Sequence, residues 1–169
     1  MTACPNCGSE NAEGANFCSV CGERLGAAEA PAEVRKIVTI VFCDVTGSTE
    51  LGEQLDPESM RKVMARYFEA MRAALERHGG SVEKFIGDAV MAVFGIPQLH
   101  EDDALRAVRA AVDMRAELRD LNHELERDHG VRLACRIGVN TGEVLVGAES
   151  SDFGRITGDA VNTAARLEA

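Results

Sequence analysis

Aromatic side chains are scarce in this sequence of 169 residues, which has no tryptophan, one tyrosine and six phenylalanines. Its core must therefore be aliphatic, since the content is 46% hydrophobic but only 4% aromatic. The longest apolar stretches, such as residues 37–43, are far shorter than the roughly 20 residues of a membrane-spanning helix. We therefore expect no membrane span. The N-terminus lacks the basic and apolar regions of a signal peptide, which makes the cytoplasm the expected location.

Basic residues are also in deficit, because 18 lysines and arginines stand against 28 aspartates and glutamates, for a formal net charge of -10. The field of such a chain repels phosphate backbones, so no nucleic-acid partner is expected. A polyanionic substrate would need a locally positive site or metal ions.

Four of the six cysteines form two Cys-x-x-Cys pairs, which are separated by ten residues and are each followed by a glycine. Two such turns can close a tetrahedral shell of four thiolates, which suits one structural Zn²⁺. A pair of disulfides or a redox-active motif is the alternative, which the expected reducing compartment and the duplication disfavour. We predict a zinc ribbon over residues 1–25 and a linker over residues 26–33. The predicted zinc ligands are Cys4, Cys7, Cys18 and Cys21.

From residue 34 the apolar pattern predicts alternating strands and helices. The predicted order begins with a buried strand over 34–45, a helix from Pro57 to Gly79, and a hairpin with strands 81–85 and 89–94. A helix from about residue 100 to Gly130 follows. The chain then forms a hairpin with strands 131–139 and 144–148 around a turn at Asn140–Gly142, and a helix from Gly158. In the second long helix the stripe expected to be apolar consists of Leu105, Val108, Val112, Leu118, Leu121 and Leu125. This order predicts an α+β fold, a ferredoxin-like sheet with helices on one face.

Two aspartates stand at positions that favour chemistry. Asp44 ends the first buried strand, and Asp88 lies in the turn of the first hairpin. If these strands are neighbours, the carboxylates converge, and their oxygens suit Mg²⁺ or Mn²⁺. The glycine-containing loop after Asp44 offers backbone N–H groups to a phosphate. Aspartate beside glycine is also ordinary turn chemistry, so spacing by itself leaves both interpretations open.

Four segments resemble the successive signatures of class III adenylate and guanylate cyclases. They are Val38–Thr49, Glu83–Phe94, Arg136–Gly142 and Gly158–Arg166. The resemblance covers residues 34–169, which we interpret as a nucleotide cyclase domain, and the front resembles the zinc ribbons that some bacterial cyclases of this class carry. It implies the conversion of ATP to 3′,5′-cyclic AMP and pyrophosphate in cyclic-nucleotide signalling.

The resemblance also implies roles for individual residues. Asp44 and Asp88, helped by the Val45 carbonyl, would hold two Mg²⁺ or Mn²⁺ ions that activate the ribose 3′-hydroxyl and neutralise the triphosphate. Asn162 would orient the ribose, and Arg166 would stabilise charge in the transition state. Without the matched segments, these two would simply be helix-surface residues. The other implied substrate-binding positions are Lys84 at the adenine ring and Gly47, Ser48 and Thr49 at the phosphates.

In this family the metal-binding residues of one subunit face the base and transition-state residues of its partner. The resemblance therefore implies a head-to-tail homodimer and an inactive monomer. Arg155 departs from the pattern, because adenylate cyclases carry an acceptor for the adenine amino group there and arginine only donates. Thr157, two residues on, has a hydroxyl that can accept instead. Guanylate cyclases place an acidic residue where Lys84 stands, so ATP is expected over GTP.

A catalytically silent, cyclase-like interaction module is the alternative function, which the intact aspartate pair disfavours. Diguanylate cyclases share the fold, but residues 86–89 do not match their hairpin motif. Cys43 and Cys135 are expected to be small buried residues. Class III domains continue past the last helix, so we expect a piece of a longer protein, with a frayed last helix and little activity alone.

Overall fold

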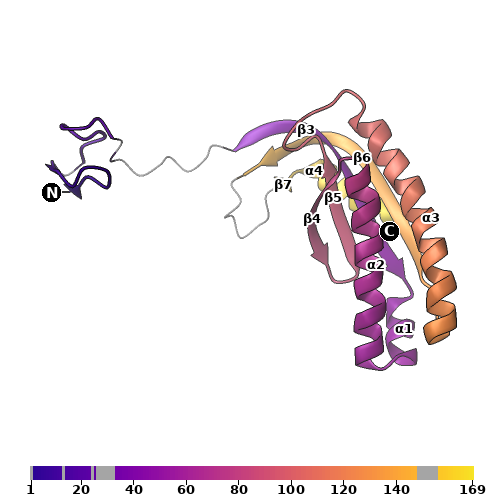
Figure 1. The fold of residues 1–169 in the computed structure, drawn as a ribbon. Helices are drawn as coiled ribbons and strands as arrows, with labels where there is room; N and C mark the ends of the chain where they lie inside the picture. Colours follow the sequence, from indigo (N-terminus) through magenta and orange to yellow (C-terminus); the bar gives the residue numbers. More distant parts are fainter. Residues whose placement is uncertain (1, 13, 24, 26–32, 148–155) are drawn as a thin grey trace. The chain divides into compact units, whose positions relative to one another are not determined.

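The computed structural model describes residues 2–12, 14–23, 25, 33–147 and 156–169. Its residue contacts divide the chain into two units, Met1–Ala32 and Glu33–Ala169, and each is described by itself (Figure 1). Most of the predicted linker lies outside the described residues. None of the helices described is both long enough and apolar enough to cross a bilayer.

The first unit has little regular structure. Two short strands, β1 (Thr2–Ala3) and β2 (Glu10–Asn11), pair antiparallel. Its large apolar side chains Phe17 and Val20 are exposed, whereas two cysteines are buried. Apolar burial therefore contributes little to holding this unit together.

The second unit is built on a five-stranded antiparallel sheet with the strand order β4-β5-β3-β6-β7. β3 lies between β5 and β6, and its centre is buried as its continuous apolar run predicts. The strands are β3 (Val34–Thr46), β4 (Ser81–Ile86), β5 (Ala89–Phe94), β6 (Ala134–Val146) and β7 (Ile156–Thr157).

Helices cover both faces of this sheet (Figure 1). α2 (Pro57–Arg77) and α3 (Asp103–His129) pack on one face, together with the end of the short α1 (Ser48–Gln54), which was not predicted. α4 (Asp159–Glu168) packs on the other face. The α+β prediction is confirmed, and the two long helices do share one face, but the last helix does not join them.

The alternation of side chains along β3 separates the two layers. Val41, Cys43 and Val45 point toward α2 and α3, whereas the intervening residues point toward α4. α2 begins where the sequence predicts, because the Asp56 carboxylate accepts hydrogen bonds from the N–H groups of the first turn. This arrangement puts Asp44 on the same face as α4.

The predicted turn at Asn140–Gly142 is wrong, because β6 runs through it without interruption and pairs with β3 along its whole length. The glycines serve another purpose. A Cβ atom at Gly138 would lie 2.2 Å from the carbonyl oxygen of Ala164, and one at Gly142 would lie 2.8 Å from the Cβ of Ala160. Bare backbone at these two positions lets α4 approach the strand closely.

The last helix is also better formed than predicted. It runs regularly to Glu168, and Ala160 and Ala164 are buried against the sheet. Arg136 on β6 donates a hydrogen bond of 2.7 Å to the carbonyl oxygen of Ala169. Packing supplies the stability that a short isolated helix lacks, so the expected fraying is not seen.

The predicted stripe of α3 is correct only in its C-terminal half. Leu118, Leu121 and Leu125 are buried, but Leu105, Val108 and Val112 are 49%, 50% and 62% exposed. The N-terminal half buries mainly small residues and a methionine instead. The residues that face the core in this half are Asp103, Ala107, Ala110 and Met114.

Candidate active site and zinc centre

The two Cys-x-x-Cys-Gly segments form two equivalent turns. In the first, the Cys4 N–H donates to the Ser9 carbonyl and the Gly8 N–H to the Cys4 carbonyl. In the second, Cys18 and Gly22 make the corresponding bonds, to the Glu23 and Cys18 carbonyls. Both glycines have φ near +74° (73° and 74°), a left-handed conformation that glycine adopts without strain.

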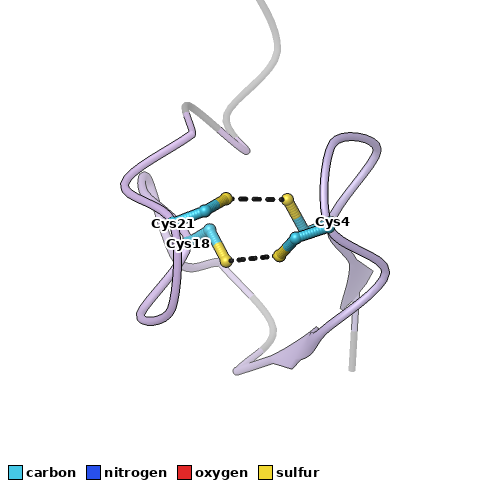
Figure 2. A group of neighbouring side chains, drawn as sticks. Cys4, Cys18 and Cys21 are labelled. Atoms are coloured by element: carbon cyan, nitrogen blue, oxygen red, sulfur yellow. Dashed lines mark hydrogen bonds between the residues drawn. The ribbon is translucent and has the colours of Figure 1, made fainter.

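These turns bring four sulfur atoms together (Figure 2). The four Sγ atoms all lie within 4.8 Å of one another, and the Cys4–Cys21 and Cys7–Cys18 pairs are each 3.6 Å apart. Four thiolates at about 2.3 Å from a Zn²⁺ ion would have S–S edges of about 3.8 Å, so the cluster fits this ion. Backbone N–H groups of Cys21 and Val20 lower the pKa of Cys18 to about 6, which favours its thiolate.

A buried side chain supports the second turn from outside the sulfur cluster. Asn11 donates to the Cys18 Sγ at 3.6 Å, and its carbonyl oxygen accepts from the Ser19 N–H at 2.9 Å. Such contacts orient a metal ligand and reduce charge on its sulfur. Asn11 was not picked out from the sequence, because nothing in its neighbourhood distinguishes it there.

In the second unit, β3 and the β4–β5 hairpin bring Asp44 and Asp88 together. The β3–β5 pairing sets Cys43 opposite Val90, so Asp44 continues toward the hairpin turn that carries Asp88. Burial, and then the negative charge of Asp88, raise the pKa of Asp44. The convergence expected from the sequence is therefore present in the structure.

One oxygen of this pair has no partner among the residues that the structure describes. The Oδ1 atom of Asp44 is buried and accepts no hydrogen bond from them. A buried unpaired acceptor next to a like charge is unfavourable, and a cation between the carboxylates would correct both defects. Carboxylate oxygens are the ligands that Mg²⁺ and Mn²⁺ prefer, so the donor set fits such ions.

A cleft of about 410 Å³ opens next to Asp88, and it is lined by Ser48, Thr49, Gly87 and Asp88, with Met60, Met64 and Phe68 as its apolar wall. Ser48 begins α1 directly after Gly47, whose left-handed conformation (φ 75°) turns the chain from strand into helix. The predicted phosphate-binding residues Ser48 and Thr49 thus share one cleft with the metal-binding candidate Asp88.

Comparison with known proteins decides the family. Residues 30–169 match the model of the adenylate and guanylate cyclase catalytic domain, and residues 4–25 match that of a zinc-ribbon domain. The chain belongs to the adenylate and guanylate cyclase family. An adenylate cyclase of Anabaena cylindrica is 33% identical over 83% of this chain and 28% of its own length. Adenylate cyclase 2 of Rhizobium meliloti is 30% identical over 76% of this chain and 35% of its own length.

Solved cyclase structures agree with this assignment. The guanylyl cyclase Cya2 is 37% identical, with a TM-score of 0.76 over 80% of this chain and 71% of that chain. The adenylyl cyclase CyaB from P. aeruginosa is 34% identical, with a TM-score of 0.76 over 81% of this chain and 73% of that chain. The chain thus spans about a third or less of the two curated relatives (28% and 35%), and similar structures include cyclases for both bases.

The two implied catalytic residues of this cyclase lie on the outer side of α4. Ala160 and Ala164 face the sheet, whereas Asn162 and Arg166 are exposed, as their offset of two residues along a helix dictates. Arg166 donates to the Thr163 hydroxyl at 3.1 Å and lies 3.8 Å from the Asp159 carboxylate. Both side chains therefore point away from the sheet face that carries Asp44 of the same chain.

The residues expected at the base lie on the two edges of the sheet. Lys84 is exposed on β4, next to an irregularity in its pairing with β5, and Thr157 is exposed on β7, opposite Leu145. Three strands separate these edges in the sheet order. Arg155 lies outside the described residues, so a shared role of these positions at the base stays a prediction.

Two charged residues beside Asp44 were missed. Arg136 is the cross-strand partner of Asp44, and its charge counteracts the rise in the pKa of that carboxyl. Glu168, at the end of α4, lies near enough that burial and then the charge of Asp44 raise its pKa. The register of β6 with β3 sets Arg136 opposite Asp44. The predicted turn at Asn140–Gly142 divided this strand, so the pairing was not foreseen.

Proposed function

We propose that this chain converts ATP to 3′,5′-cyclic AMP and pyrophosphate as one subunit of a head-to-tail homodimer. The observation that carries the proposal is the buried, unpartnered Asp44 oxygen beside Asp88. Nothing else in the described fold requires two carboxylates to converge there, and the cost of that convergence is removed when cations bind.

Asp44 and Asp88, with the Val45 carbonyl, would hold two Mg²⁺ or Mn²⁺ ions. Bound ions of this kind lower the pKa of the ribose 3′-hydroxyl and neutralise the triphosphate. The backbone and hydroxyls of Gly47, Ser48 and Thr49 receive the phosphates in the adjoining cleft.

The 3′-oxygen then forms a bond to the α-phosphorus while the bond to pyrophosphate breaks. Asn162 orients the ribose, which keeps the 3′-oxygen in line with the leaving group. The Arg166 guanidinium stabilises the charge that builds on the phosphate oxygens.

The direction of the α4 side chains supports the homodimer. Asn162 and Arg166 are exposed and face away from their own sheet. A second copy placed head to tail would set these residues over the first copy's aspartates, and the same contact would form a second, equivalent site. A single chain would hold the ions but lack the residues that act on ribose and phosphate.

ATP is the proposed substrate because Lys84 carries a donor for a ring nitrogen of adenine, where an acidic residue would suit guanine. Thr157 is the proposed acceptor for the adenine amino group. Relatives with both activities are similar to this chain, so the base preference depends on these side chains rather than on overall similarity.

The zinc ribbon supports a place in the cytoplasm, since four thiolates survive as metal ligands in a reducing compartment. There the domain would supply cyclic AMP for intracellular signalling. The ribbon would serve as a structural cap or a protein contact.

Product formation from ATP and from GTP with Mn²⁺ tests the proposal. The assay is run on this 169-residue chain. We expect cyclic AMP from ATP, and expect it to be lost in Asp88→Asn. Cyclic GMP as the main product would contradict the base assignment, and no product from either nucleotide would favour the silent module.

A further inference from the structure

Two cysteines that this mechanism does not use lie beside the proposed metal site. Cys43 immediately precedes Asp44 on β3, and Cys135 is the cross-strand partner of Val45 on β6. Both belong to the sheet face that packs against α2 and α3, so they lie behind the site rather than in it.

The pairing register makes the two cysteines diagonal neighbours. Cys43 pairs with Ile137, and Val45 pairs with Cys135. The two cysteines therefore lie on adjacent strands, offset by two residues, with their side chains on the same face of the sheet.

Their surroundings differ in a way that suits stepwise chemistry. Cys43 is fully buried, and its Sγ lies 3.2 Å from the hydroxyl of Tyr67. Cys135 lies at the rim of the same cluster and keeps part of its surface exposed. A small oxidant can therefore reach Cys135 first, while Cys43 is held in place to react second.

We propose that Cys43 and Cys135 form a modification site, a dithiol that hydrogen peroxide converts to a disulfide. The Cys135 sulfur attacks one peroxide oxygen and becomes a sulfenic acid, and the other oxygen leaves as water. The Cys43 sulfur then attacks the sulfenic sulfur and expels hydroxide, which takes the Cys43 proton and leaves as a second water. The two thiols lose two electrons and two protons in all, and one hydrogen peroxide becomes two waters.

Closing this bond moves the strands next to the metal site. Diagonal neighbours on antiparallel strands lie about 7–8 Å apart, whereas the Cα atoms of a disulfide lie about 5.5–6 Å apart. Because β3 and β6 are already paired there, the diagonal distance can shorten only if the two strands slide or twist locally beside Asp44 and Val45, and Tyr67 loses the thiol it contacts. We expect the oxidised protein to bind Mn²⁺ about tenfold more weakly. This second step rests on the proposed function, whereas the disulfide does not.

Peptide mapping tests the disulfide directly. The zinc-loaded chain is treated with hydrogen peroxide, blocked at its free thiols and digested with trypsin, which releases Cys43 on peptide 37–61 and Cys135 on peptide 133–136. We expect these two peptides to be joined and to have lost two hydrogens. Two separate peptides, with Cys135 oxidised or unmodified and Cys43 still a thiol, would overturn the proposal.

Mn²⁺ titration tests the coupling. Cys135→Val and Cys135→Ser keep all four ribbon thiols, so they control for oxidation elsewhere, and we expect their Mn²⁺ affinity to be unchanged by peroxide. In the unsubstituted chain we expect about a tenfold loss that a thiol reductant restores. Equal affinity of the reduced and disulfide forms would overturn the coupling. Failure of the reduced chain to bind Mn²⁺ would contradict the proposed function, and the peptide map would still decide the disulfide.

Discussion

The two units of this chain use metal-binding residues in opposite ways. The ribbon has two strands of two residues, exposed apolar side chains and four converging sulfurs, so the ion must supply most of its stability. The cyclase domain has an extensive apolar core on both faces of its sheet, so its fold does not depend on ions. Its aspartates are instead held in an unfavourable arrangement that the proposed cations would relieve.

The difference separates a structural metal from a functional one on physical grounds. In the ribbon, removal of the ion should unfold the unit, because the ion supplies most of its stability. In the cyclase domain, the core forces two carboxylates together, and under the proposed function the lost stability would be available as binding free energy for the ions and their substrate. Substitution of a metal-binding residue should therefore lower both metal binding and stability in the ribbon. In the cyclase domain it should lower activity but raise the stability of the metal-free fold.

The largest effect is expected for Asp44→Asn, which should lower cyclase activity by more than about a hundredfold because it removes a ligand to the activating ions. The same change should raise the free energy of unfolding of the metal-free domain at pH 7, since it removes a partly buried charge beside Asp88. Activity assays and urea unfolding check both. An active or a less stable variant would contradict the assignment of this pair.

The same pair predicts a pH dependence of stability. The pKa of Asp44 is raised above its usual value of 3.8, so the folded state keeps this proton to higher pH than the unfolded state. Stability of the metal-free domain should therefore fall as pH rises from 3.8 through the raised pKa, and then level off. Comparison with Asp44→Asn isolates this term from other carboxylates. Parallel curves for the two proteins would contradict it.

Removal of zinc should unfold residues 4–25 and leave the cyclase domain intact. A chelator that strips the ion eliminates the contacts that hold the two turns together, whereas the aliphatic core is untouched. Amide exchange of each unit, with and without chelator, measures the effect. Asn11→Ala should weaken the same site without emptying it, and lower zinc affinity about 10–100-fold. Loss of protection in the cyclase domain would show that the units are not independent.

Gly138→Ala should destabilise the cyclase domain by about 1–3 kcal/mol, because the added Cβ would meet the backbone of α4. Displacing α4 also moves Arg166, so activity should fall with stability. Gly52→Ala in α1 is the matched control, since a Cβ there meets nothing within 4 Å and should stabilise by about 0.5–1 kcal/mol. Equal unfolding free energies for the two variants would contradict the close packing of α4 on β6.

Base preference should give the smallest effect. We expect ATP to be cyclised faster than GTP, but with discrimination about tenfold to a hundredfold weaker than a complete lysine and acceptor pair would give, because a missing base contact forfeits about 1–3 kcal/mol. The preference should be reduced further in Lys84→Ala. Competition between the two nucleotides measures the ratio. A faster rate with GTP would show that Lys84 does not recognise adenine.

Sequence reasoning was most successful where local chemistry decides the structure. The Asp56 cap, the turn at Gly87 and the buried run of β3 each depend on residues close in the chain, as do the paired turns of the ribbon. To predict that Asp44 and Asp88 converge, the strand order was needed as well, and the match to the family signatures provided this order.

The failures came where distant segments decide. Gly142 serves close packing rather than a turn, which is visible only once α4 is placed on β6. Apolar Val108 and Val112 lie outside because α3 approaches the sheet through alanines. Cys43 and Cys135 lie 92 positions apart in the sequence, and only the register of β3 with β6 brings them together.

Mixing two inactive variants tests most directly the claim that each active site is shared between two chains. Asp44→Ala removes one half of a site and Arg166→Ala the other, so each homodimer should be inactive. After subunit exchange at equal amounts, half the dimers are mixed, and each holds one intact site, which should restore about a quarter of the unsubstituted activity. A mixture no more active than its two components would contradict the shared site.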